Sequence, residues 1–175
     1  MKVYMAAGPH HIPGWLNTDI RDKQHADGRW FKPDVIVDMA KPLPWTDDSL
    51  EAITESHGLM FLTPEQVGGW FVECFRVLRP GGTLRVTEDE AIRRPKIYGG
   101  GRWKMWNPRE IEAMDFAKNA GFLTRCVAEL ETVFGDPSIC VNLHSGRPKA
   151  WFVECVKPER QSLNGRHHAT EQRPT

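Results

Sequence analysis

The spacing between the first two apolar runs of this chain limits its fold more than any other feature. In MKVYMAAGPHHIPGWLNTDI, one run ends near Gly8, the next ends at Asp19, and only Pro9–Gly14 separates them. A crossover between parallel strands usually takes at least ~10–12 residues, because it normally contains a helix. Six extended residues span ~20 Å, which is enough to return along a five-residue strand of ~16 Å. The two runs can therefore be parallel strands only if a bare strap, residues 9–14, joins them without a helix.

Strand-like and helix-like segments alternate along the rest of the chain. The predicted strands are short apolar or β-branched runs between turn residues, at Lys2–Ala6, Trp15–Ile20, Asp34–Val37, Glu51–Thr54, Thr83–Thr87, Leu123–Ala128, Ile139–Leu143 and Lys149–Val156. This alternation is typical of an α/β protein with a mostly parallel sheet covered by helices. The turn-forming residues Ser145–Pro148 predict that the sheet ends in an antiparallel hairpin.

Two helices have clear start and stop signals. The first is predicted over Pro64–Arg79, where one apolar stripe consists of Val67, Trp70, Phe71, Cys74, Phe75 and Leu78. Thr63 and Gln66 form a capping box at its start, and Pro80-Gly81-Gly82 ends it. The second helix is predicted over Pro108–Ala120, with Asn107 as N-cap, Glu110 completing a capping box and Gly121 as C-cap.

Composition predicts one soluble domain over residues 1–157. The chain has 175 residues, of which 40% are hydrophobic and 26% charged, enough for a real core. Lys plus Arg and Asp plus Glu balance at 23 each, so no overall field points to nucleic acid, and any nucleic-acid contact would have to be local. Residues 158–175 have almost no apolar side chains, and we expect this tail to be disordered.

Further expectations concern location and cysteines. No N-terminal signal pattern and no apolar run of about 18 residues are visible, which favours a cytoplasmic protein without membrane contact. The cysteines are Cys74, Cys126, Cys140 and Cys155. None forms a C-x-x-C pair and each has apolar neighbours, so we expect small core residues in a reducing compartment and no metal site.

Polar residues and a glycine follow the predicted strands where each strand ends. Gly8 follows the first strand, Asp19 ends the second, Asp38 follows the third, and Glu55-Ser56-His57 follow the fourth. Ligands of open parallel sheets bind at the carboxyl ends of the strands. One carboxylate at the end of a second strand can accept both hydroxyl protons of a ribose. These residues therefore predict a site for a ligand with hydroxyls, an amino group and a close backbone contact.

Four segments, taken in their order along the chain, carry a family resemblance. They are MAAG (5–8), GWLNTDI (14–20), DVIVDMAKPLPWTDDSLEAITESHGLMFL (34–62) and FRVLRPGGTLRVTE (75–88), which together extend over roughly half of the chain. In this order they resemble the class I S-adenosylmethionine-dependent methyltransferases of the short methyltransferase-domain type. The resemblance implies a reduced, Rossmann-like class I methyltransferase fold that lacks the usual first helix, and S-adenosyl-L-methionine as the cofactor.

The resemblance also implies roles for the residues at the strand ends. Ala6, Ala7 and Gly8 would lie beside the methionine part of the cofactor, Asp19 would hold the ribose, Asp38 and Met39 would face the adenine, and Ser56 and His57 would lie near the sulfonium. Each position also has a structural alternative. Gly8 could be an ordinary turn, Asp19 and Asp38 could cap turns, and His57 could satisfy backbone groups.

The segment 88–108 is the candidate substrate lid. It combines three consecutive glycines, Gly99–Gly101, with basic and aromatic residues. We predict that Tyr98, Arg102, Trp103 and Trp106 contact the substrate, since such side chains stack on rings and hold phosphates. The alternative is a mobile loop whose tryptophans dock onto the sheet. If the acceptor must lose a proton, His57 is the candidate base, with Glu55 and Glu88 behind it.

The leading hypothesis is methyl transfer from S-adenosyl-L-methionine to an unidentified acceptor, which can be a small molecule, a glycan, a nucleic acid or a protein. The alternative is a non-catalytic relative of this fold that serves as a binding or assembly module. The missing helix would leave apolar surface around Trp15 and Leu16, where a second copy could dock as a homo-oligomer. Another nucleotide-binding α/β enzyme is a third hypothesis, although G-x-G-x-x-G is absent.

Overall fold

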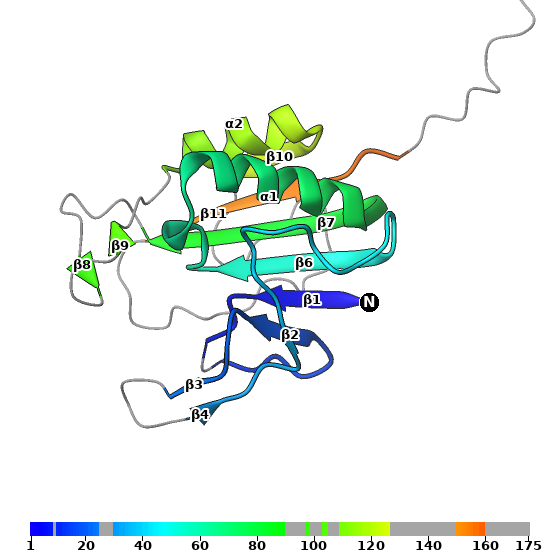
Figure 1. The fold of residues 1–175 in the computed structure, drawn as a ribbon. Coiled ribbons are helices and arrows are strands. Elements are labelled where there is room, and N and C mark those ends of the chain that lie inside the picture. The colour runs from blue at the N-terminus through cyan, green and yellow to red at the C-terminus, as the bar shows by residue number, and fades with distance from the viewer. Residues whose placement is uncertain are drawn as a thin grey trace, which may run out of the picture.

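The computed structural model describes residues 1–8, 10–24, 30–89, 97–98, 103–104, 109–126 and 150–159. Figure 1 shows a central sheet with the two long helices side by side on one face. The sheet consists of β1 (Lys2–Met5), β2 (Leu16–Asp19), β5 (Val35–Ile36), β6 (Leu50–Ser56), β7 (Leu78–Asp89), β10 (Leu123–Cys126) and β11 (Ala150–Val156). Smaller elements are the hairpins β3 (Lys23–Gln24) with β4 (Trp30–Phe31) and β8 (Ile97–Tyr98) with β9 (Trp103–Lys104), and the 3-10 helix η1 (Leu59–Phe61).

The strand order is β10-β11-β7-β6-β1-β2-β5. The five strands from β7 to β5 are parallel, whereas β11 pairs antiparallel with both β7 and β10. The order reverses between β1 and β6, the point beside which open α/β sheets bind ligands. This confirms the predicted mostly parallel sheet with an antiparallel C-terminal end. The strand predicted over residues 139–143 and the turn over 145–148 lie outside the described residues.

The helix α1 (Pro64–Val77) forms where its capping box and apolar stripe predict it. The Thr63 side chain accepts from Gln66 N, and Thr63 N donates to Gln66 Oε1 at 2.8 Å. Its buried face, Val67, Trp70, Phe71, Cys74 and Val77, packs in the main core. The helix ends two residues before the predicted end, because Leu78 adopts an extended backbone and begins β7.

The helix α2 (Glu110–Ala120) begins later than predicted. Its N-cap is Arg109, whose backbone N–H donates to Glu112 Oε2 at 2.8 Å, so the predicted cap by Asn107 with Glu110 is wrong. The other end agrees with the prediction, since Gly121 has φ +106° and is the C-cap. That left-handed conformation favours glycine because it has no Cβ.

The connection from β1 to β2 contains no helix in its described residues, 6–8 and 10–15. The expected exposed apolar surface around Trp15 is not found, because Trp15 is only 7% exposed. It packs in a small second core with Tyr4, Ala7, Ile12 and Ala52. Asn17 holds the strap against the sheet. Its Nδ2 donates to Trp15 O at 2.8 Å and its Oδ1 accepts from Ile12 N at 2.8 Å. Leu16 is half-buried against the main core.

The sheet face opposite the two helices carries many buried polar side chains. Residues alternate between faces along a strand, and Ile53 and Val86 lie in the core beneath α1. The residues that alternate with them are therefore on the other face. They include the buried Thr54, Ser56, Thr83, Arg85 and Thr87, and Glu154 of β11 is likewise buried. This face thus combines buried polar side chains with the small second core around Trp15.

The cysteine predictions are partly confirmed. Cys74 and Cys155 are buried free thiols, as expected of small core residues. Cys126 is exposed, so that prediction is wrong for this residue, which lies on the edge strand β10. Cys140 and residues 160–175 of the predicted tail lie outside the described part of the chain. Within the described residues, no helix is both long and apolar enough to cross a membrane.

Candidate functional site

Gly8 and Asp19 meet at the carboxyl ends of β1 and β2. The Gly8 N–H donates to Asp19 Oδ2 at 3.0 Å, and the Ile20 N–H donates to Asp19 Oδ1 at 2.8 Å. Asp19 is 5% exposed, so both carboxylate oxygens lie in a protected position. A carboxylate oxygen can accept more than one hydrogen bond. Asp19 therefore caps its own turn, as the structural alternative stated, and also presents a carboxylate beside Gly8.

Three segments meet at Gly58, just past β6. A Cβ added to Gly58 would lie 2.7 Å from Ala6 Cβ, 2.9 Å from Glu55 Oε1 and 3.0 Å from Met39 Sδ. The ends of β1 and β6 and the turn after β5 therefore come together at one point. Ala6 has φ +53°, a left-handed conformation that costs a residue with a Cβ about 1–2 kcal/mol. Ala6 and Met39 were predicted in the site from the sequence, whereas Gly58 was not.

Asp38 caps the turn that follows β5. Its Oδ1 accepts from Ala40 N at 3.0 Å, and its Oδ2 lies 3.4 Å from Lys41 Nζ. Asp38 therefore caps a turn, which was the structural alternative to a ligand-binding role. Its side chain is still 30% exposed, next to Met39 in the chain, so it remains accessible to a ligand.

Ile20 is a neighbour of this region that was not among the predicted site residues either. The pairing of Asp19 with Ile36 places Ile20 opposite Val37, one residue from Asp38. Ile20 is 56% exposed. An apolar residue directly after a strand-end carboxylate was the sequence signal that could have identified it.

His57 follows β6 and has φ +60°. Its backbone N–H donates to Thr87 O at 2.9 Å, which ties the turn after β6 to β7. Its Nδ1 lies 3.7 Å from Glu88 Oε2, and its side chain is 20% exposed. Residues with a Cβ in this conformation concentrate at functional sites, where the surrounding contacts hold them. Both predicted roles, satisfying the backbone and reaching the site, are compatible with this position.

Glu55 and Glu88 form a fully buried carboxyl pair below this turn. Glu55 Oε1 accepts from Gly58 N, and Glu88 Oε1 accepts from Leu59 N at 2.7 Å. Burial, followed by the charge of Glu88, raises the pKa of the Glu55 carboxyl well above its ordinary value. Two neighbouring carboxyl groups that are both buried are more stable when they share one proton than when both are ionised.

Ser56 is buried and lies on the opposite sheet face from Glu55. Its hydroxyl hydrogen-bonds to Tyr4, and burial, followed by the charge of Glu55, raises the pKa of the Tyr4 phenol. Ser56 thus links the end of β6 to β1 on the sheet face opposite the helices.

The predicted lid is described only in part. β8 and β9 pair antiparallel, with Tyr98 opposite Trp103, and Figure 1 shows them beyond the carboxyl ends of β6 and β7. Arg102, Trp106 and Gly99–Gly101 lie outside the described residues. The substrate role of Tyr98 and Trp103 stays a prediction.

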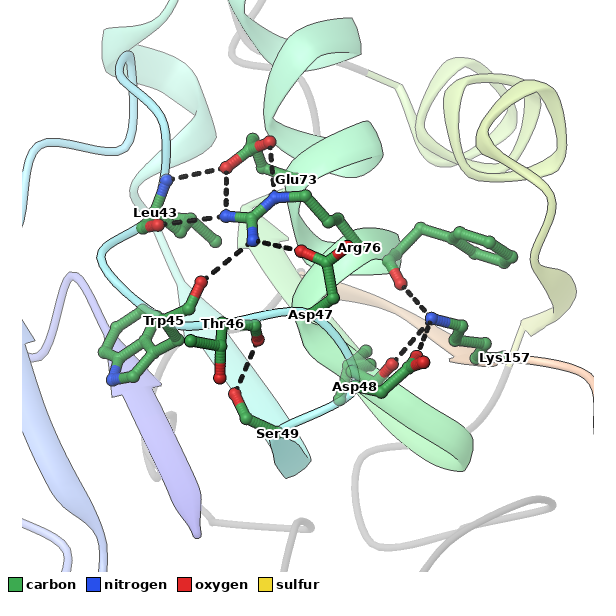
Figure 2. Close-up of polar contacts among 11 residues, drawn as sticks. Leu43, Trp45, Thr46, Asp47, Asp48, Ser49, Glu73, Arg76 and Lys157 are labelled. Atoms are coloured by element: carbon green, nitrogen blue, oxygen red, sulfur yellow. Dashed lines mark hydrogen bonds and ion pairs between the residues drawn. The ribbon is translucent and has the colours of Figure 1, made fainter.

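Two segments that carry the family resemblance, the loop before β6 and the end of α1, contact each other at the end of β6 opposite the candidate site. Figure 2 shows these contacts. Arg76 Nη1 donates to Trp45 O at 2.9 Å, and Nη2 donates to Leu43 O at 3.0 Å and to Glu73 Oε2 at 2.7 Å. Lys157 Nζ donates to Asp48 Oδ1 at 2.6 Å and also to the carbonyls of Phe75 and Leu78. These contacts join the loop before β6 to α1 and to the end of β11, about 20 Å along β6 from the candidate site.

Comparison with known proteins gives the family context. Residues 16–86 match the family described as "Methyltransferase domain". The demethylmenaquinone methyltransferase of Beutenbergia cavernae is 36% identical over 75 residues, a match that spans 42% of this chain and 30% of that protein. The chain thus matches less than a third of this curated relative.

Solved structures share the fold at low identity. A SAM-dependent methyltransferase from Methanosarcina mazei superposes with a TM-score of 0.58 and 15% identity, over 91% of this chain and 92% of that one. A putative methyltransferase of Haloferax volcanii was solved in complex with the Trm112 methyltransferase activator. It superposes with a TM-score of 0.56 and 14% identity, over 92% of this chain and 83% of that one. These likenesses establish the class I methyltransferase fold.

Proposed function

We propose that this chain, which has the class I methyltransferase fold and matches the methyltransferase-domain family over residues 16–86, transfers a methyl group from S-adenosyl-L-methionine to an acceptor. The observation that carries this proposal is the meeting of the β1 end, the β6 end and the turn after β5 around Gly58, one strand away from Asp19. A ligand bound there can contact backbone, apolar side chains and carboxylates together.

The chemistry of these residues fits the cofactor. Its ribose needs acceptors for two hydroxyls, which the protected carboxylate of Asp19 supplies. Its adenine needs an acceptor and an apolar surface, for which Asp38, Met39 and the exposed Ile20 are suited. Its cationic sulfonium and ammonium favour a carboxylate nearby, and Glu55 Oε2 is buried without a hydrogen-bond partner among the described residues.

The methionine part of the cofactor is assigned to the first strand end. Ala6 and Gly8 both have positive φ, +53° and +54°, which turns the chain sharply between them. Ala7 N donates to Thr18 O at 3.0 Å, and Ala7 is buried, so this turn is fixed to β2. A fixed turn with a glycine allows a close backbone approach without a helix. A helix N-terminus chiefly favours phosphates, which this cofactor lacks.

The cofactor supplies an activated methyl group when bound, so the chain has to align the acceptor and exclude water. We assign to His57 the role of general base for an acceptor that must lose a proton. Glu88 Oε2 lies 3.7 Å from Nδ1, a separation that favours the imidazole orientation in which Nε2 is available to the acceptor. Ser56 stays part of the proposed cofactor site through its position between Glu55 and His57.

We assign the acceptor side to the 88–108 segment, with Tyr98, Arg102, Trp103 and Trp106 as contact residues. The position of β8 and β9 beyond the strand ends supports this assignment (Figure 1). The curated relative is named for demethylmenaquinone, so this quinone is a first compound to include in an acceptor panel. Cytoplasmic location stays a prediction of the same proposal.

A non-catalytic module is the second candidate. A neighbour of the same fold is solved with an activator protein, which supports testing for a protein partner of this chain as well. The exposed apolar residues Ile20, Trp30, Val35 and Ile36 gather at the free β5 edge and its neighbouring elements. A homo-oligomer would therefore use this edge, since Trp15 is buried.

Thermal unfolding with S-adenosylhomocysteine tests the proposal. The expected result is a rise in the melting temperature at millimolar ligand that Asp19→Asn abolishes or strongly reduces. Asp22→Asn, an exposed carboxylate three residues away, is the matched control and should keep the full shift. No shift in the unmodified chain, or an equal shift in Asp19→Asn, would reject the site. A stable oligomer without ligand binding would favour the module instead.

A further inference from the structure

We propose that Glu55 and Glu88 together hold one proton before the cofactor binds and release it when S-adenosyl-L-methionine arrives, so that the pair distinguishes the cationic cofactor from its uncharged sulfide product. This inference rests on the proposed function and concerns the same site. This role is separate from the positioning of His57 by Glu88. The two glutamates act through the charge that they place beneath the cofactor.

The geometry brings the two carboxyl groups together. β6 and β7 pair in parallel, with Glu55 opposite Val86 and Ser56 opposite Thr87, so Glu88 follows directly past the end of β6. Both glutamates are on the helix side of the sheet and are 0% exposed. Consecutive N–H groups of one turn, those of Gly58 and Leu59, each donate to one of them.

Hydrogen bonds leave part of this pair unsatisfied. Within the described part of the chain, the second oxygen of Glu55, Oε2, is buried and accepts no hydrogen bond. A buried carboxylate oxygen without a donor is costly, whereas a protonated carboxyl or an added cation removes that cost. The atom is therefore suited to exchange a proton for a positively charged ligand.

Of the described groups that face Glu55, none carries a permanent positive charge. From β1 the facing side chain is Met5, from α1 the Cys74 thiol, and from the turn the His57 imidazole. Burial, followed by the charges of Cys155 and Glu55, raises the pKa of the Cys74 thiol, so it stays neutral. Burial and Glu88 raise the pKa of Glu55 itself.

The pair is also adjacent to the proposed cofactor. Glu55 Oε1 shares its surroundings with Ala6 and Met39 around Gly58, and both of those residues belong to the proposed cofactor site. A cation placed there stabilises the doubly ionised pair, and one proton leaves to solvent for each cofactor bound. After methyl transfer the sulfur is uncharged, and the pair regains a proton from solvent. The product is thereby held less well than the cofactor.

Isothermal titration calorimetry tests this with S-adenosylmethionine and S-adenosylhomocysteine at pH 5.5 and pH 7.0, in buffers of different ionisation enthalpy. Both values lie below the range where an α-amino group titrates. We expect up to one proton released per cofactor and none per product. The preference for the cofactor should rise with pH, by at most about tenfold per pH unit.

Glu55→Gln should remove the pH dependence of the cofactor-to-product preference. Glu51→Gln, on the same strand but paired with Lys2 at its surface, should behave as the unmodified chain. A cofactor-to-product preference that does not change with pH, or equal proton release by both ligands, would overturn the inference and leave methyl transfer intact. Failure of both ligands to bind would reject the proposed function and this inference with it. If Glu55→Gln does not fold, the number of protons that the unmodified chain releases per bound ligand still tests the inference.

Discussion

The backbone N–H of Gly8 donates to Asp19 Oδ2 at 3.0 Å, so one hydrogen bond ties the end of β1 to the end of β2. The chain between them is too short for a helix, and Asn17 folds it back onto the sheet. A single carboxylate therefore fixes the first turn and is also the group proposed to hold the ribose. The structural and ligand-binding roles of Asp19 are compatible.

Ala6→Gly should stabilise the fold. Ala6 has φ +53°, where a Cβ costs about 1–2 kcal/mol, whereas the added freedom of glycine in the unfolded chain costs about 0.4–1 kcal/mol. We expect a net gain between zero and about 1.6 kcal/mol in the free energy of unfolding, measured with urea. Ala7→Gly is the control, and it should destabilise because Ala7 is buried and has no positive φ. A loss of stability in Ala6→Gly would contradict the strained backbone.

Gly58→Ala should disturb the site and the fold together. The added Cβ would meet Ala6 Cβ at 2.7 Å and Met39 Sδ at 3.0 Å, distances that force neighbours to move. Such overpacking costs about 1–3 kcal/mol, and the melting-temperature shift with S-adenosylhomocysteine should fall. Gly69→Ala on the exposed face of α1 meets nothing within 4 Å and should stabilise by about 1 kcal/mol. Unchanged ligand binding in Gly58→Ala would remove Gly58 from the site.

One of the two predicted capping boxes was correct and the other, Asn107 with Glu110, was wrong, whereas tertiary contacts explain the failures at Trp15 and Gly58. The capping box of Thr63 and Gln66 needs only its own residues, so its prediction was confirmed. Trp15 was expected to be exposed, but its burial depends on Asn17 bonds and on Ala52 from another strand. The importance of Gly58 likewise depends on neighbours up to 52 positions earlier in the chain, such as Ala6.

The predicted strand ends did come together, because parallel strands place their carboxyl ends on one edge. The sequence could not separate binding from capping at Asp38, since one carboxylate can do either. The R-V-L-R-P-G-G segment falls within residues 16–86, which match the methyltransferase-domain family, but its Arg76 is a structural contact far from the candidate site.

The stability of the unmodified chain should fall as pH rises above about 4.5, the ordinary pKa of a glutamate, through the contribution of Glu55. Its pKa is raised in the folded state, so above that pH the unfolded chain loses the proton while the folded chain keeps it. Ionisation thus favours the unfolded state until pH reaches the raised folded-state pKa. Glu55→Gln should remove this loss and be more stable at pH 7, as measured by urea unfolding between pH 4 and pH 8. An identical pH dependence in Glu51→Gln and Glu55→Gln would show that Glu55 is not the group responsible.

Arg76→Lys should destabilise the fold without changing ligand affinity. The guanidinium donates to Glu73 at 3.0 Å and 2.7 Å and to the carbonyls of Leu43 and Trp45, a pattern that one ammonium cannot reproduce. We expect a loss of about 1–3 kcal/mol in the free energy of unfolding. The exposed Arg79, changed to Lys, is the control and should stay within about 0.5 kcal/mol. Because this cluster lies at the opposite end of β6 from His57, the affinity for S-adenosylhomocysteine, measured by calorimetry well below the melting temperature, should change less than about twofold. A tenfold loss of affinity at unchanged stability would show that the cluster belongs to the functional site after all.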